Sequence, residues 1–305
     1  MKRHVNRTGL VNGAASLISI ALGLLFGFLL LLIFNPPFAL YGFDNLMTTG
    51  FASSEKLAKV FYQSAPLLMT GLSVAFAFKT GLFNIGATGQ YTMGAFFALM
   101  AVIQFKLPWW AGLLLGMVGG ALLGAIPGIC KALFNVNEVI TSIMFNWIAL
   151  FAVNLSLNNM PKMLANAWGA INKDRTAALL SSKFTAYNPN ATIPKAGLDE
   201  LLGSNYINIG VFIAIFVALI IWVVMNRTTF GYELKACGYN RFASDYAGIN
   251  AKRNIMLSMT IAGALAGIGG GLYYLSGTAQ YTMVKSLLSM GFNGIPVALL
   301  ASSNP

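Results

Sequence analysis

Long apolar runs separated by shorter polar segments dominate the chain. A bilayer's hydrocarbon core of about 30 Å is crossed by roughly 20 helical residues. Seven runs of about that length are predicted to span a membrane. They are Ala14–Phe34, Val60–Phe78, Asn84–Phe105, Trp109–Cys130, Glu138–Asn159, Tyr206–Met225 and Asn254–Ser276. An eighth run opens at Gly291 and meets the chain end after about ten residues, too few to span. The pattern predicts an all-α polytopic membrane protein with about eight transmembrane helices, the last cut short.

Composition agrees with a membrane protein, since 57% of the residues are hydrophobic and only 9% are charged. Soluble domains carry about 25% charged residues. The formal charge of +11 is read as cations flanking membrane helices and not as a nucleic-acid surface. The isolated Cys130, Cys237 and His4 make no metal or disulfide framework. No metal, cofactor or nucleic-acid partner is therefore expected.

The N-terminus is basic, and the apolar run after it is longer than the 7–15 residues of a signal peptide. We therefore expect a cytoplasmic tail over residues 1–13, a retained first helix, and one transmembrane domain over residues 14–305. Polar segments 35–59 and 160–205 are predicted outside, and segment 226–253 inside. Ten of the 19 Lys and Arg residues then lie inside. Five of the outer nine lie in segment 160–205, and long loops translocate with less regard to charge.

Segment 226–253 is a polar island with five cations and two acids. Asn240 is a good N-cap, RFASDYA follows, and Gly248 stands where a C′ glycine belongs. Phe242 and Tyr246 share one side of this predicted short helix. Such a helix suits docking into a partner's groove, or else rests as an amphipathic connector on the lipid headgroups.

Two glycine ladders at four-residue spacing predict close helix packing, because small residues let backbones approach in lipid. Their members are Gly112, Gly116, Gly120, Gly124 and Gly128 in one run and Gly263, Gly267 and Gly271 in another.

The segment KTGLFNIGATGQYT, Lys79–Thr92, predicts a broken helix at the start of a span. Irregular backbone at membrane depth occurs where protein or a wet cavity satisfies it, and transporters often place substrate there. The alternative is an ordinary helix start capped at the inner surface. The candidate pathway residues are Asn84, Thr88, Gln90, Asn146 and Asn293.

Three stretches carry a resemblance: GLFNIGATGQ, FGYELKACGYNRFASDYAGINAKR and GFNGIPVALL. They resemble bacterial ABC importer permeases of the branched-chain amino acid, ribose and nucleoside type, and look most like the nucleoside branch. The resemblance covers roughly residues 60 to 305 in the right order. It implies that the island carries a coupling helix, which fits a cleft on the ATPase. The implied coupling residues are Gly238, Asn240, Arg241, Ala243, Asp245 and Gly248.

The resemblance implies a permease subunit in the bacterial plasma membrane that imports nucleosides. No GxxxxGK[S/T] stretch is present, so ATP must be bound by a separate cytoplasmic ATPase subunit. The implied partners are a second permease subunit, homologous or identical, an extracytoplasmic substrate-binding lipoprotein, and the membrane lipids. Family members continue beyond the eighth apolar run, so we expect this chain to be truncated at its C-terminus.

Other functions are weighed against this one. A proton-coupled secondary transporter usually keeps titratable groups inside its spans, and here only Glu138 lies in one, at its end. Sodium coupling through carbonyls and hydroxyls would escape that test. An intramembrane enzyme needs a nucleophile with its base or a metal pair, and no such motif is found. A simple sugar would suit the pathway nearly as well as a nucleoside, whereas a branched-chain amino acid would need both charges compensated.

Overall fold

The computed structural model describes residues 2–301. The regular elements of these residues are helices. In chain order they are α1 (Lys2–Phe34), α2 (Pro36–Thr48), η1 (Thr49–Phe51), α3 (Ser54–Lys79), α4 (Ala87–Ile103), α5 (Trp109–Phe134), α6 (Glu138–Asn158), η2 (Pro161–Met163), η3 (Ala165–Trp168), α7 (Ser182–Tyr187), α8 (Leu198–Leu202), α9 (Gly210–Arg227), α10 (Thr229–Tyr239), α11 (Arg241–Tyr246), α12 (Ala251–Tyr274) and α13 (Ser289–Leu300). Met1 and the end of the eighth apolar run, residues 302–305, lie outside the described residues.

The prediction of an all-α polytopic membrane protein is confirmed. In the described part of the chain, six helices are long and apolar enough to cross a membrane: most of α1, and α3, α5, α6, α9 and α12. The shorter apolar helices α4 and α13 occupy the other two predicted positions. Helix α4 is shorter than the predicted Asn84–Phe105 because the chain becomes helical only at Ala87.

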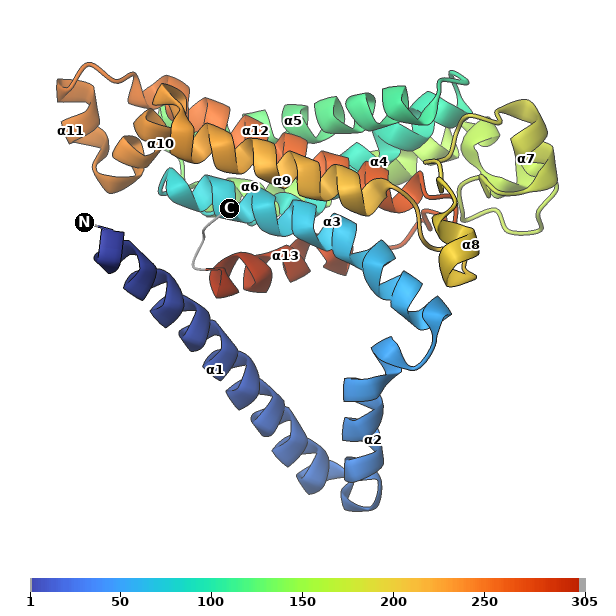
Figure 1. The fold of residues 1–305 in the computed structure, drawn as a ribbon. Helices are drawn as coiled ribbons and strands as arrows, with labels where there is room; N and C mark the ends of the chain where they lie inside the picture. The colour runs from blue at the N-terminus through green and yellow to red at the C-terminus, as the bar shows by residue number, and fades with distance from the viewer. Residues whose placement is uncertain (1, 302–305) are drawn as a thin grey trace.

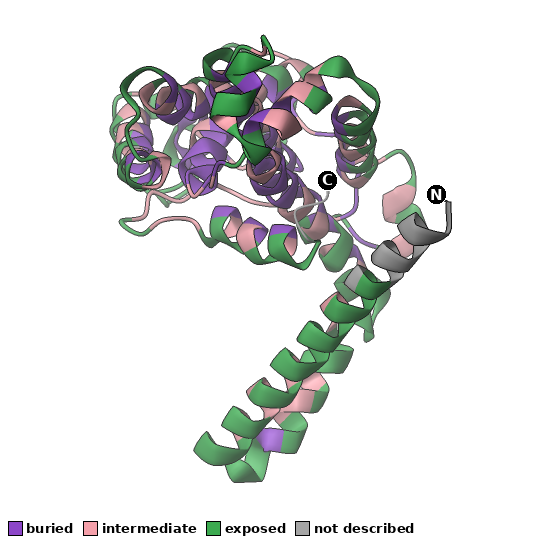
Figure 2. Ribbon diagram, turned by 90° about the vertical axis from the view of Figure 1, so that its left-hand side faces the viewer, coloured by how far each residue is buried: buried purple, intermediate pink, exposed green. Residues whose placement is uncertain are grey.

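The bundle is organised around α12, which packs against α3, α4 and α5. Figure 1 shows these helices and α9 running along one common direction, with α10 and α11 at one end and α7 and α8 at the other. Buried residues concentrate inside this bundle, whereas α2 and the part of α1 whose burial the structure describes are mostly exposed (Figure 2). An apolar, exposed helix of that kind is suited to contact with lipid or with another membrane subunit.

The predicted outer loop over residues 35–59 is wrong, because most of it is helical. Helix α2 begins with Pro36 and Pro37 in its first turn, where the missing N–H groups would have had no helical partner. These prolines end one helix and start the next. Helix α3 begins early because Ser53 caps it, accepting a hydrogen bond from the Lys56 N–H at 3.3 Å. A Glu55–Lys59 ion pair at 2.8 Å lies on its first turns.

The glycine ladders of α5 and α12 lie against each other. A methyl group on Gly120 would overlap the carbonyl oxygen of Gly263, and one on Gly267 would overlap that of Gly116. Gly124 lies against the backbone of Met259 and Gly263 in the same way. The ladder ends differ, since Gly112 and Gly271 chiefly meet side chains. In its central part the contact is therefore backbone to backbone, as small-residue ladders permit in lipid.

The polar segment 160–205 forms a compact layer at the far end of the bundle. Phe184 is fully buried there, between Trp168 and Tyr187. Asn188 donates to the carbonyl oxygens of Val102 (2.9 Å) and Leu107 (3.0 Å), which ties the layer to the end of α4. Segment 275–288, which follows α12, packs against this layer. The Thr176 N–H donates a hydrogen bond to the Tyr281 carbonyl at 2.9 Å. Burial raises the pKa of Tyr281 to about 12, so its hydroxyl stays protonated.

Candidate functional site

The break between α3 and α4 is set by Gly81. Its φ of 73° is left-handed, and it ends α3 with two crossing hydrogen bonds. The Gly81 N–H donates to the Phe78 carbonyl (3.0 Å) and the Leu82 N–H to the Ala77 carbonyl (3.1 Å). This is a Schellman motif, which glycine at C′ favours. The chain then runs without helical structure to Ala87, so the predicted irregular backbone before α4 is present, and its depth in the membrane stays a prediction.

Two amides predicted for the pathway bind each other. Asn84 Nδ2 donates to Gln90 Oε1 at 2.8 Å, and Gln90 Nε2 donates to Asn84 Oδ1 at 3.0 Å. Asn84 also donates to Ser73 Oγ of α3 (3.1 Å), whose own proton goes to the Ala262 carbonyl of α12 (2.6 Å). Both amides are buried, with exposed fractions of 0% and 1%. The pair therefore ties the broken segment to two spans.

Asn146 reaches the same segment from α6. Its Oδ1 accepts from the Gly89 N–H at 2.8 Å, and its Nδ2 donates to the Ile85 carbonyl at 3.1 Å. Gly89 lies in the first turn of α4, where N–H groups have no partner within their own helix. Asn146 thus caps α4 from a neighbouring helix and satisfies buried backbone groups that would otherwise be unpaired.

Two buried hydroxyls beside this segment have unused hydrogen-bonding capacity. Among the side chains that the structure describes, Thr88 Oγ1 and Ser142 Oγ are buried without a hydrogen-bond partner, and both residues have an exposed fraction of 0%. Gly291 of α13 lies directly against the backbone of Thr88. Ser142 was not among the sequence candidates. Its position one turn before Asn146 on α6 is the pattern by which it could have been found.

Asn293 is not part of this cluster. It lies on an exposed side of α13, while Gly291 and Gly294 of the same helix pack inward on Thr88 and Thr70. The aromatic Trp147 is also turned outward, with 42% of its surface exposed, and stacks on Phe151. The described residues therefore gather four of the five candidates, Asn84, Thr88, Gln90 and Asn146, and leave Asn293 apart.

The second candidate element lies at the α10–α11 end of the bundle. Helix α11 confirms the predicted short helix: Asn240 Oδ1 accepts from the Ala243 N–H at 3.1 Å, and Gly248 follows with a φ of 83°. Helix α10 was not predicted. It begins where Thr228 caps it through the Gly231 N–H at 3.2 Å, a cap of the usual Ser/Thr kind.

Several of the residues implied for coupling make contacts within the chain. A methyl group on Gly238 would overlap the Lys79 carbonyl oxygen, so α10 is seated on the end of α3. Asp245 Oδ1 accepts from the Ala251 N–H (3.2 Å) at the start of α12. Arg241 donates to the Ala132 carbonyl of α5 at 3.5 Å. Together, α10 and α11 are therefore connected to three spans: α10 contacts α3, and α11 contacts α5 and α12.

The exposed faces of α10 and α11, turned away from the bundle, carry aromatic rings that pack on no other ring of the described residues. Tyr239, Phe242 and Tyr246 are 91%, 76% and 95% exposed. A concavity of about 460 Å³ lies between the two helices and is lined by Tyr232, Tyr239 and Ala243 among others. Contiguous exposed apolar surface on a protein marks an interaction site.

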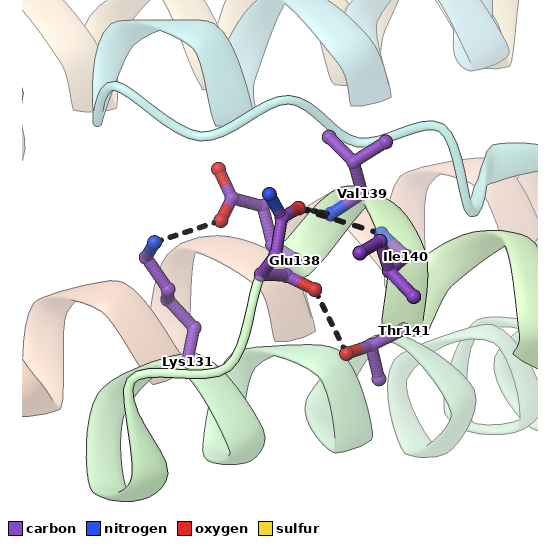
Figure 3. A network of polar contacts seen from close by, with 6 residues as sticks. Lys131, Glu138, Val139, Ile140 and Thr141 are labelled. Atoms are coloured by element: carbon purple, nitrogen blue, oxygen red, sulfur yellow. Dashed lines mark hydrogen bonds and ion pairs between the residues drawn. The ribbon is translucent and has the colours of Figure 1, made fainter.

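The α5–α6 turn beside this element is braced by polar contacts (Figure 3). Lys131 in the last turn of α5 pairs with Glu138 in the first turn of α6 at 2.9 Å. Asn137 Oδ1 caps α6 through the Val139 N–H at 2.8 Å. Each charge also complements the dipole of its own helix. The turn next to the Arg241 contact is therefore locally fixed.

The described residues thus form a bundle of candidate membrane spans, with a polar non-helical segment before α4 and an exposed short helix at one end. Residues 56–305 match the family model described as branched-chain amino acid transport system / permease component. The chain belongs to this family of ABC transporter permeases, which are transporters and not enzymes. Such a permease is a multi-pass membrane protein of an ABC transporter system with ATPase and substrate-binding partners.

Several named transporter permeases are similar to this chain over most of its length. The chain is 36% identical over 298 residues to the nucleoside ABC transporter permease protein NupB of Lactococcus lactis, covering 95% of this chain and 78% of the relative. It is 37% identical over 292 residues to the guanosine ABC transporter permease protein NupP of Bacillus subtilis, covering 94% and 79%. A glucose ABC transporter permease protein of Haloferax volcanii is 28% identical over 274 residues, covering 88% and 69%. No solved structure matches the chain significantly.

Proposed function

We propose that the chain is the membrane permease subunit of an ATP-driven importer that carries nucleosides across a bacterial plasma membrane. The substrate class is supported by the two relatives above 35% identity, whose names specify nucleoside and guanosine transport. An uncharged substrate with several hydroxyl and amide groups also suits a site built from amides and hydroxyls without ions. A sugar is the second candidate, supported by the glucose permease at 28% identity.

The observation that carries the ATP-driven mechanism is the aromatic surface of α10 and α11. Its rings are exposed, while α10 packs on α3 at Gly238 and the side chains of Arg241 and Asp245 connect α11 to α5 and α12. A motion imposed on this surface by an ATPase subunit would therefore be passed directly to the spans. In this proposal ATP binds the partner, and the coupling residues Gly238, Asn240, Arg241, Asp245 and Gly248 hold α11 in position. Ala243 contributes to the docking concavity.

We place the α10–α11 end in the cytoplasm, together with the N-terminus. Five cations lie in segment 226–253, as expected of a cytoplasmic loop. Helix α1 begins toward the same end of the molecule (Figure 1). The compact layer of α7 and α8 then faces outward, where a substrate-binding lipoprotein would deliver its cargo.

We assign the transport pathway to the side of the broken segment. Thr88 and Ser142 offer the hydroxyls with unused capacity, and Asn84, Gln90 and Asn146 hold the backbone around them. Asn293 lies on the exposed side of α13, apart from these residues. It lines the pathway only if the pathway runs between this chain and a second permease subunit, homologous or identical.

The coupling surface is tested best at its rings. Replacing Gly238 or Asp245 would disturb contacts inside the chain, whereas Phe242 and Tyr246 have exposed side chains. The double variant Phe242→Ala/Tyr246→Ala should insert normally in the membrane. Its association with the ATPase should weaken about thirtyfold or more, because truncating an aromatic anchor costs about 2 kcal/mol.

The matched control is Tyr41→Ala, a ring on α2 that is 70% exposed. The assay is substrate-stimulated ATP hydrolysis of the purified complex in proteoliposomes at several ATPase concentrations. The control should behave as the unaltered permease does. Undiminished stimulation in the double variant would sink the assignment of α11 as the docking element.

A further inference from the structure

Besides the concavity between α10 and α11, a polar cavity lies where α10 packs on the end of α3. It has a volume of about 340 Å³ and is lined by Phe78, Lys79, Asn226, Lys235, Gly238 and Tyr239. Two lysines, Lys79 at the end of α3 and Lys235 on α10, thus line the same space. The cavity lies on the inner side of α10, apart from the concavity of the aromatic surface, although Lys235 and Tyr239 border both.

The positive charge in this cavity has no acidic counterpart. Lys79 is half-buried, and its ammonium group makes no hydrogen bond or ion pair with any residue the structure describes. Lys235 donates only to the neutral Asn226 Oδ1, at 2.9 Å. The ion pairs of the described residues lie elsewhere, at Glu55, Glu138 and Asp199. Two like charges at a partly buried site repel each other more strongly than in water.

The acidic side chains of α10 and α11 make hydrogen bonds elsewhere in the chain. Glu233 on α10 accepts a hydrogen bond from Asn254 at 3.1 Å, and Asp245 accepts from the Ala251 N–H. An external anion would supply what the chain does not: negative charge for both ammonium groups and acceptors for their free N–H bonds.

We propose that this cavity binds a phosphate-class anion, held between the ammonium groups of Lys79 and Lys235, which fastens α10 to the end of α3. The phosphate of an anionic lipid headgroup and a free phosphate ion share the chemistry that the site recognises. A lipid is the occupant favoured by position. The candidate spans α3 and α9 end at Lys79 and Arg227, so the cavity lies at the boundary between membrane and water.

Two further features favour a lipid headgroup. Trp222, five residues before the end of α9, is 41% exposed, and tryptophan is enriched at membrane–water interfaces. Basic residues next to a span attract anionic lipids. The anion would stabilise the contact at Gly238, where α10 meets the Lys79 carbonyl. The proposal rests on the proposed function only for the leaflet, taken as the cytoplasmic one.

Lipid binding can be measured on the purified chain in nanodiscs, without transport. Retention of phosphatidylglycerol is read by native mass spectrometry in mixed phosphatidylglycerol and phosphatidylcholine discs. The variant Lys79→Gln/Lys235→Gln should bind phosphatidylglycerol about thirtyfold more weakly, which corresponds to about 2 kcal/mol at 1.4 kcal/mol per tenfold change. Phosphatidylcholine retention should not change. The control Lys252→Gln removes an exposed cation from the same end of the bundle and should bind as the unaltered chain does.

A second arm separates the two sources of phosphate. Inorganic phosphate is added to chains in pure phosphatidylcholine discs, and the melting temperature is followed. A rise in the unaltered chain that is absent from the double variant identifies free phosphate as an occupant. The single variant Lys235→Gln, outside the spans, covers the case in which the double variant does not fold. Equal phosphatidylglycerol retention in folded variants and unaltered chain, with no response to phosphate, overturns the proposal. That result leaves nucleoside import untouched, since no step of transport is measured.

Discussion

Replacing Asn146 on α6 by leucine should destabilise the permease more than the same replacement of Asn293 on α13. Leucine has nearly the same size, so the change removes hydrogen bonds and leaves little cavity. The Gly89 N–H and the Ile85 carbonyl would lose their bonds of 2.8 and 3.1 Å. Asn146 is only 1% exposed, so water cannot readily reach these two backbone groups and replace the lost hydrogen bonds.

The expected cost follows from those two groups. Leaving a buried donor or acceptor unpaired costs about 1–3 kcal/mol each. Side-chain hydrogen bonds in membrane proteins average less, about 0.6 kcal/mol, because the unfolded state finds other partners. Non-helical backbone at a helix start has few alternatives, so we expect about 2–4 kcal/mol in total. At roughly 2–4 °C per kcal/mol this lowers the apparent melting temperature by about 4–16 °C.

The assay is thermal unfolding in detergent with a thiol-reactive dye, whose reaction with the buried Cys237 reports loss of structure. Asn293→Leu is the matched control, because Asn293 is exposed on α13 and makes no hydrogen bond with described residues. Its melting temperature should stay within about 1–2 °C of the unaltered chain. If Asn146→Leu melts together with Asn293→Leu, the bracing role of Asn146 is refuted.

Two further variants separate structure from transport. Thr88→Val removes a buried hydroxyl that has no partner among the described residues, so the melting temperature should hold or rise, while the KM for nucleoside uptake should increase about three- to tenfold if that hydroxyl contacts substrate. Uptake kinetics on a stable Thr88→Val protein that match the unaltered chain would count against that contact. Gly120→Leu would force a side chain into the Gly263 carbonyl and the Gly267 backbone, and should abolish monodisperse folded protein in size-exclusion chromatography. Gly27→Leu, on α1 with nothing within 4 Å, should elute normally; equal elution of both would argue against the tight α5–α12 contact.

Much of the architecture could be predicted from local pattern. Apolar length predicts most of the apolar helices to within about four residues, because a bilayer sets the length of a span, although α3 begins at Ser54 and not at the predicted Val60. The caps at Asn240 and Gly248 predict α11 because capping depends on neighbouring backbone alone. The prediction for residues 35–59 was wrong, because Pro36 and Pro37 occupy the first turn of α2, where proline suits a helix start.

The arrangement of the candidate site could be predicted only in part. Sequence identified Asn84, Gln90 and Asn146 as unusual polar residues in a span, but not that two of them bind each other and the third caps α4. Those partners come from helices distant in sequence, and periodicity does not specify them. Ser142 and the outward position of Asn293 depend on helix rotation within the bundle. The cavity of Lys79 and Lys235 needs the seating of α10 on α3, which no local pattern encodes.

Uptake of radiolabelled guanosine, ribose and leucine by cells with and without this gene tests the central claim most directly, with and without depletion of ATP. The account predicts that guanosine uptake falls when the gene is removed, that ATP depletion abolishes the difference, and that ribose and leucine uptake do not change. Guanosine uptake that is the same in both cells, or a gene-dependent uptake that survives ATP depletion, would contradict an ATP-driven nucleoside permease.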